Sequence, residues 1–174
     1  MPTKPSGSGV EMLKLVRQFK TLDAKREQGL SAAEEKQYKE LCDKLSHKLD
    51  PESYDKSPKR NALRVNTRQE IRLGSGKDFK NVYMHNISGG GLYLASKENL
   101  PVGSTIKMNL FFKEENYHVE LEGKITWTNP KGVNHLPPGM GVQFKNLSSD
   151  QEKFIRRLIH GVLDKSILAD EGKK

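Results

Sequence analysis

The segment from Asn86 to Ser96, NISGGGLYLAS, contains the residues that decide how this chain folds. Three consecutive glycines, 89–91, stand between two segments, 81–85 (NVYMH) and 92–96 (LYLAS), that have the composition of β-strands. Glycine allows positive φ and close approach of backbones, so it suits the connection between two such strands. The sequence therefore predicts a β-hairpin with a glycine turn at its centre.

The same period-two alternation extends on both sides of this hairpin, from Asn61 to about residue 146. Turn signals rich in glycine and proline divide it into six short segments, which read QEIRL, DFKNVYMHN, GLYLAS, TIKMNLFFK, YHVELEGKITWTN and GMGVQFKN. Six antiparallel strands of this length predict a closed barrel, because closure removes exposed edges. A helix capped by Ser148 or Ser149 follows, and we expect its apolar face to cover an open side or end of the barrel.

Helical periodicity replaces alternation in the first part of the chain. Apolar residues at spacings of three and four predict a hairpin of two helices over 10–49 that breaks at Gly29. The sequence Ser31-Ala-Ala-Glu34 is typical of a capping box at the start of the second helix. Cys42 lies on the apolar stripe, where a buried thiol is expected.

The predicted organisation has five parts. They are a disordered N-terminus at 1–9, the helical hairpin at 10–49, a linker at 50–59, the barrel with its closing helix at 60–165, and a tail at 166–174. The hairpin is too short to enclose a core, so its apolar stripes must pack on each other, on the barrel or on a second copy of the chain.

Composition restricts the class of protein. The chain has 174 residues, a formal charge of +8 and one cysteine, which suits a reducing cytoplasm. It contains neither an apolar run long enough to span a bilayer nor a group of histidines and cysteines at metal-ligand spacing. Much of the excess positive charge lies between Lys59 and Lys80, which favours an anionic partner. We find no catalytic set of residues, and we expect neither an enzyme, a cofactor, a metal site nor membrane insertion.

Two polar residues beside the glycine turn can form hydrogen bonds. Asn86 and Ser88 lie on one face of an extended segment, beside glycines without side chains. An amide and a hydroxyl on such a bare surface can hydrogen-bond a flat polar ligand, although a plain turn without a ligand would also contain glycines. Trp127 is a second candidate for stacking on a ligand, but its alternation with Ile125 favours packing in the core or at the barrel rim.

A pair of arginines, Arg60 and Arg64, precedes the first predicted strand. Guanidinium groups bind phosphates bidentately and also contact guanine. The order Arg60-x-x-x-Arg64, then Asn86-x-Ser88-x-x-Gly91, resembles the PilZ domain family of bacterial cyclic di-GMP receptors. The resemblance extends over about residues 58–165 and leaves the helical hairpin outside it.

The resemblance implies a role for each matching residue. Arg60 and Arg64 would contact the phosphates and guanine faces of cyclic di-GMP, with Lys59 as an additional phosphate contact. Asn86 and Ser88 would hydrogen-bond a guanine edge, and Gly91 would keep the surface clear. An amide at position 86 has one acceptor oxygen, whereas a carboxylate accepts from both N1–H and N2–H of guanine.

The resulting hypothesis is a cytoplasmic cyclic di-GMP effector in which ligand binding moves the arginine arm and the helical hairpin. The hairpin would serve as an output surface for a protein partner or as a dimerisation element. The alternative is a PilZ-like module that binds a protein and no nucleotide. Binding of DNA or RNA is not expected, because the basic segment 59–80 contains Phe79 as its only aromatic residue. The downstream pathway, the number of bound ligands and the oligomeric state stay open.

Overall fold

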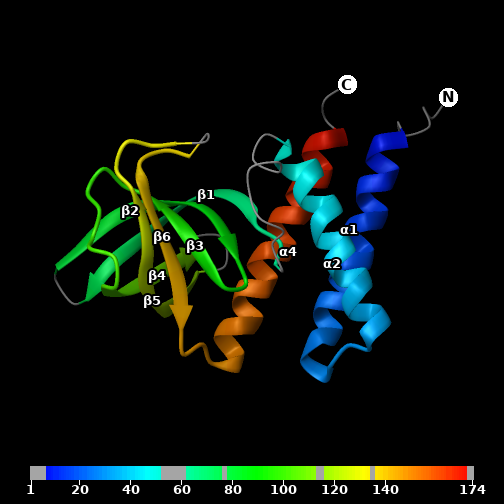
Figure 1. The fold of residues 1–174 in the computed structure, drawn as a ribbon, viewed down its shortest axis with the longest axis horizontal. Helices are drawn as coiled ribbons and strands as arrows, with labels where there is room; N and C mark the ends of the chain where they lie inside the picture. Colours follow the sequence, from blue (N-terminus) through cyan, green and yellow to red (C-terminus); the bar gives the residue numbers. More distant parts are fainter. Residues whose placement is uncertain (1–6, 52–61, 76–77, 113–115, 134–135, 172–174) are drawn as a thin grey trace. The chain divides into compact units, whose positions relative to one another are not determined.

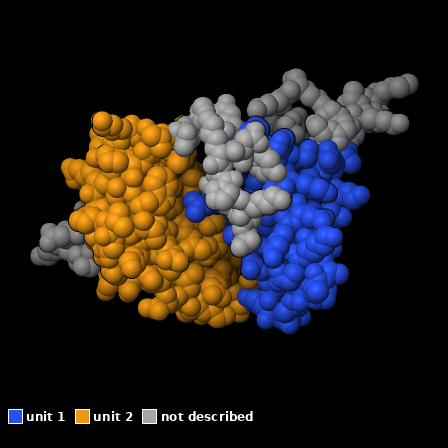
Figure 2. All heavy atoms as spheres, in the orientation of Figure 1, with its two compact units in different colours: residues 1–65, 158–174 blue, residues 66–157 orange. Residues whose placement is uncertain are grey.

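The computed structural model describes residues 7–51, 62–75, 78–112, 116–133 and 136–171. Figure 1 shows its helices and strands along the chain. They are α1 (Gly7–Lys25), the 3-10 turn η1 (Arg26–Gln28), α2 (Ala32–Leu49), β1 (Val65–Ser75), β2 (Asp78–Ser88), β3 (Gly91–Ala95), β4 (Thr105–Phe112), β5 (Tyr117–Asn129), β6 (Gly139–Lys145) and α4 (Ser149–Glu171). The chain divides into two compact units, residues 1–65 with 158–174 and residues 66–157, which Figure 2 colours separately.

The second unit contains the predicted barrel. Its six strands close in the order β1-β2-β3-β6-β5-β4, with antiparallel pairing between neighbours such as β2–β3 and β4–β5. This confirms the six-stranded antiparallel fold. Inward-facing side chains fill the interior, and those that are almost completely buried include Met84, Ile87, Leu92, Leu94, Met108, Leu110, Leu121 and Ile125.

The helix after the barrel begins with a capping box. Ser148 Oγ accepts from the Gln151 N–H, and Gln151 Oε1 accepts from the Ser148 N–H. Gln151 also donates through Nε2 to the Glu120 carbonyl on β5, at 2.7 Å. The ring of Phe154 packs on that of Tyr117 at the start of β5, with centroids 5.2 Å apart. These contacts tie the first turns of α4 to the barrel.

The other unit contains the helical hairpin. Ser31 and Glu34 form the predicted capping box at the start of α2, and Gly29, with φ 92°, ends η1. The predicted apolar stripes are buried, including Val16 and Phe19 of α1 and Leu45 of α2. Helix α1 begins at Gly7, before the expected start at residue 10. Residues 52–59 of the predicted linker lie outside the described residues.

The second half of α4 belongs to the same compact unit as the hairpin. Helix α4 continues to Glu171, through most of the segment that we expected to be a tail. His160 Nε2 lies 2.8 Å from Oδ2 of Asp23, a carboxylate that is 7% exposed and also accepts from the Tyr38 hydroxyl at 3.1 Å. A buried carboxylate needs such partners, because an unpaired charge is costly inside a protein. The network therefore ties α4 to both helices of the hairpin.

Candidate functional site

The glycine turn connects β2 to β3 through two residues, Gly89 and Gly90. Ser88 pairs with Gly91 across the hairpin, so the strands begin immediately on either side of the turn. None of the three glycines has positive φ, in contrast to Gly74, Gly103 and others. A Cβ added at Gly89 or Gly90 would meet no atom within 4 Å. The conformational freedom of glycine is thus not needed at this turn, and what the glycines provide is an open surface without side chains.

A glycine is needed at position 91 for a different structural reason. A Cβ at this position would lie 2.2 Å from the Val142 carbonyl oxygen on β6, where Gly91 pairs with Gln143. The obstructing atom belongs to the backbone of a barrel strand, so it cannot move aside as the end of a side chain would. Gly91 is therefore required for the close approach of β3 and β6.

Asn86 lies next to an irregularity in β2. The pairing register with β3 shifts between Met84 and Asn86, which is typical of a β-bulge at His85. Asn86 is 7% exposed, and among the described residues its Oδ1 has no hydrogen-bond partner. Buried acceptors in proteins are nearly always satisfied. Among the described residues, Asn86 Oδ1 is therefore an unsatisfied buried acceptor on this face.

Ser88 lies on the same outer face of β2 as Asn86, because the intervening Ile87 points into the core. Its side chain is nearly buried, and its hydroxyl donates to the Gly91 carbonyl oxygen over 3.3 Å. That distance is at the long end for an O–H donor. The hydroxyl can therefore exchange this weak bond for one to a ligand.

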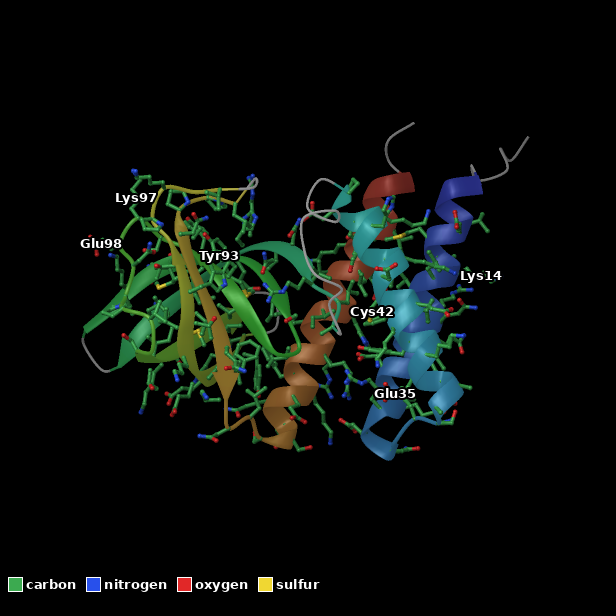
Figure 3. All side chains as sticks on the ribbon, in the orientation of Figure 1. Lys14, Glu35, Cys42, Tyr93, Lys97 and Glu98 are labelled. Atoms are coloured by element: carbon green, nitrogen blue, oxygen red, sulfur yellow. The ribbon has the colours of Figure 1, made fainter. Side chains whose placement is uncertain are left out.

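Cross-strand pairing extends this face into a row across four strands. Asn86 pairs with Tyr93 on β3, Tyr93 with Gly141 on β6, and Gly141 with Trp127 on β5. Tyr93 is fully buried, and Figure 3 labels it on its strand. Burial raises the pKa of the Tyr93 hydroxyl, so this group stays neutral and protonated at ordinary pH. The row joins an amide to two aromatic rings.

The position of Trp127 corrects a sequence-based expectation. The register of β5 against β6 shifts between Ile125 and Trp127, so no residue of β6 lies opposite Thr126 in the pairing. Ile125 is completely buried in the barrel, whereas Trp127 is on the outer face and 38% exposed. The prediction that both lie on one face is wrong, because the extra residue reverses the alternation. Alternation alone also did not indicate Tyr93, which becomes part of the row only through pairing.

The structure brings together three of the six predicted site residues, Asn86, Ser88 and Gly91. Arg64 is half-buried and engaged in contacts just before β1, and it belongs to the unit that contains the helical hairpin. The predicted residues Lys59 and Arg60 lie outside the described residues.

In the described part of the chain, the histidines, the cysteine and the acidic residues include no group of three that could hold a metal ion. None of its helices is both long and apolar enough to cross a bilayer.

The family model of the PilZ domain matches residues 58–161, which is more than half of the chain. The chain belongs to the PilZ domain family. A comparison by sequence with curated proteins finds no match. The matched region covers all six strands of the barrel and the first half of α4, so the hairpin of α1 and α2 lies outside the PilZ domain.

Solved structures of PilZ proteins share the fold. One is YcgR from Escherichia coli in complex with c-di-GMP, with a TM-score of 0.56 and 12% identity over 66% of this chain and 50% of that chain. The PilZ domain of YcgR with c-di-GMP gives a TM-score of 0.52 and 14% identity over 67% of this chain and 100% of that chain. The inhibitor of motility MotI/DgrA from Bacillus subtilis gives a TM-score of 0.50 and 14% identity, over 63% of this chain and 54% of that chain. The chain thus matches about half the length of full YcgR and of MotI/DgrA.

Proposed function

We propose that this PilZ protein is a receptor for cyclic di-GMP. The observation that carries the proposal is the outer face of β2. There Asn86 Oδ1 is buried with no hydrogen-bond partner among the described residues, beside Ser88 and a turn without side chains. Membership of the PilZ family supports it, as do the YcgR structures of the same fold, which contain c-di-GMP.

The chemistry of guanine fits this face. Asn86 Oδ1 accepts one hydrogen bond from N1–H or N2–H of the base, and its Nδ2 can donate to an acceptor on the ligand. Ser88 gives up its long bond to Gly91 and contacts the same edge. The open surface over Gly89 and Gly90 admits the flat ring, because no side chain stands there.

The phosphates of the ligand require positive charge. In this proposal Arg60 and Arg64 bind them bidentately, and Lys59 adds a third cation. Because these residues precede β1, their engagement would move the segment that joins the helical hairpin to the barrel. The bound nucleotide would thereby change the position of the hairpin, which acts as an output surface or a dimerisation element.

Isothermal titration calorimetry with cyclic di-GMP tests the site. We expect micromolar or tighter binding by the full chain, and a loss of at least about 100-fold in the double variant Arg60→Ala/Arg64→Ala, because charge-assisted hydrogen bonds are strong. The variant Arg68→Ala/Arg72→Ala has the same spacing on exposed positions of β1 and serves as the matched control. It should bind like the wild type.

The outcomes separate the hypotheses. Absence of heat with the wild-type protein would overturn the receptor function and favour a PilZ module that binds a protein partner. Binding that survives in Arg60→Ala/Arg64→Ala but is lost in the Arg68/Arg72 control would move the phosphate contacts to β1. Small-angle scattering with and without ligand then tests the movement of the hairpin. If the hairpin moves, the scattering curve should change when ligand is added.

A further inference from the structure

The glycine turn between β2 and β3 lies against the last strand of the barrel. The N–H of Phe144 on β6 donates to the Gly90 carbonyl oxygen over 3.0 Å, and Gly91 pairs with Gln143. Strand β3 lies between β2 and β6 in the closed sheet (Figure 1). The carboxyl end of β6 therefore borders the turn, although neither of the two sequence motifs includes a residue of this strand.

Two side chains at this end of β6 point outward from the barrel. Phe144 is buried in the core, whereas Gln143 is exposed and Lys145 is half-buried. Because successive side chains of a strand point to opposite faces, Gln143 and Lys145 lie on the outer face. Ser88, Gly91 and Gln143 form one cross-strand row on that face. Neighbouring strands are about 4.8 Å apart, so Ser88 and Gln143 are separated by roughly 10 Å of surface without a side chain.

Among the described residues, no acid pairs with the ammonium group of Lys145. Glu122 lies opposite it in the pairing of β5 with β6, yet these two side chains form no ion pair. The side chain of Gln143 likewise forms no hydrogen bond within the described part of the chain. By contrast, Lys80 of β2 and Lys20 of α1 each pair with a carboxylate. Because burying a charge without a partner is costly, a half-buried ammonium group favours the binding of an anion.

The shape of guanine directs a phosphate toward this end of β6. In the receptor function proposed above, the base lies flat over the turn and meets β2 through the edge that carries N1–H and N2–H. The ring atom N9, to which the sugar is attached, lies on the opposite side of the base from N1. The sugar and its phosphate therefore leave the base on the side away from β2, and across the bare turn that side is β6.

We propose that Lys145 and Gln143 are ligand-binding residues, which hold a phosphate of the bound nucleotide at the β6 side of the turn. The inference rests on the proposed receptor function and adds a cation from a strand outside the arginine segment. Lys145 Nζ supplies a positive charge on a flexible stem, and Gln143 Nε2 donates a hydrogen bond to the same phosphate. The ligand thus lies between polar side chains of β2 and β6.

Isothermal titration calorimetry of the full chain with cyclic di-GMP tests this assignment. Lys145→Met keeps an apolar stem and removes the charge, and we expect about ten-fold weaker binding because a hydrogen bond to a charged group is lost. Gln143→Leu removes the donor and should weaken binding about three-fold. Lys107→Met is the matched control, because it removes the same charge from an exposed position on β4, which β5 separates from β6. It should bind like the wild type.

The salt dependence of binding gives a second measurement. The affinity of Lys145→Met should fall less steeply with rising salt than the affinities of the wild type and Lys107→Met, since salt screens the lost contact between charges. Circular dichroism of the variants without ligand checks that the barrel is intact.

The outcomes distinguish this inference from the receptor function. Binding by Lys145→Met that equals wild-type binding overturns the inference and leaves the receptor function standing. Equal losses in Lys145→Met and Lys107→Met also overturn it, because they would show an effect of total charge and not of a local contact. Absence of binding by the wild type overturns the receptor function and this inference together.

Discussion

The ring of Trp127 stacks on that of Tyr93, with centroids 5.2 Å apart and planes at 29°. The Tyr93 hydroxyl donates to the Pro137 carbonyl at 2.6 Å and accepts from Asn129 Nδ2 at 3.2 Å, so this ring is fixed at its polar end. Both rings lie in the cross-strand row that begins at Asn86. The stack therefore fixes the half-exposed indole of Trp127 on a buried ring, in the row that includes Asn86.

The stack depends on the glycine between its two strands. A Cβ at Gly141 would lie 2.0 Å from Trp127 Nε1, so we predict that Gly141→Ala displaces the indole and lowers the free energy of unfolding by about 1–3 kcal/mol. Trp127 is the sole tryptophan, so its emission should shift to longer wavelength. Gly90→Ala is the control, since a Cβ there meets no atom. An unshifted emission in Gly141→Ala would contradict the packing.

Gly91 should tolerate substitution less well than its neighbour in the turn. Gly91→Ala directs a Cβ to within 2.2 Å of the Val142 carbonyl oxygen, and we expect a loss of about 2 kcal/mol or more in urea denaturation because strands β3 and β6 must separate. Gly89→Ala should cost less than about 1 kcal/mol. Equal stability of the two variants would show that the close contact with β6 is absent in solution.

The amide of Asn86 limits the affinity for guanine in the proposed receptor. Asn86→Asp supplies two acceptor oxygens with a negative charge, and we expect cyclic di-GMP to bind about ten-fold more tightly at neutral pH. The same change places a carboxylate at a position that is 7% exposed, so the free energy of unfolding without ligand should fall. Calorimetry and urea denaturation measure the two effects. Weaker binding by Asn86→Asp would argue against a guanine edge at this residue.

Cys42 should behave as an unreactive core thiol. Burial raises its pKa to about 11, so the thiolate that reacts with alkylating agents is scarce at pH 8. The unfolded chain has the lower, ordinary thiol pKa. The contribution of this group to the free energy of unfolding is therefore fully present at pH values below that pKa. It is lost as the pH rises toward 11. We expect iodoacetamide labelling at pH 8 to be at least about 100-fold slower than in guanidinium chloride. Equal rates would place the thiol at the surface.

Much of this architecture was predictable because it depends on neighbours in sequence. The capping box of Ser31 and Glu34 and the apolar stripe with Val16 and Phe19 follow from helical spacing, and the structure contains both. Alternation likewise predicted the six strands, and the order of the motifs at Arg60 and Asn86 predicted the PilZ family.

Which side chains point outward from the barrel was not predictable, since strand register depends on pairing between distant segments. Single-residue irregularities at His85 and Thr126 change which side chains face outward. Alternation counts residues along one strand and cannot detect them. The function of Gly91 illustrates the same limit, because the atom that excludes a side chain there belongs to Val142, about fifty positions away.

The amino-acid sequence by itself determined the elements of this protein, its family and three polar or bare positions at one turn. Local hydrogen bonding and the periodicity of apolar residues are sufficient for that. Only the tertiary structure decided that Asn86, Tyr93 and Trp127 form one row, and that the amide of Asn99 is buried with no hydrogen-bond partner in the described part of the chain. Both features arise when a sheet closes into a barrel, because closure fixes the register of strands that lie far apart in the chain.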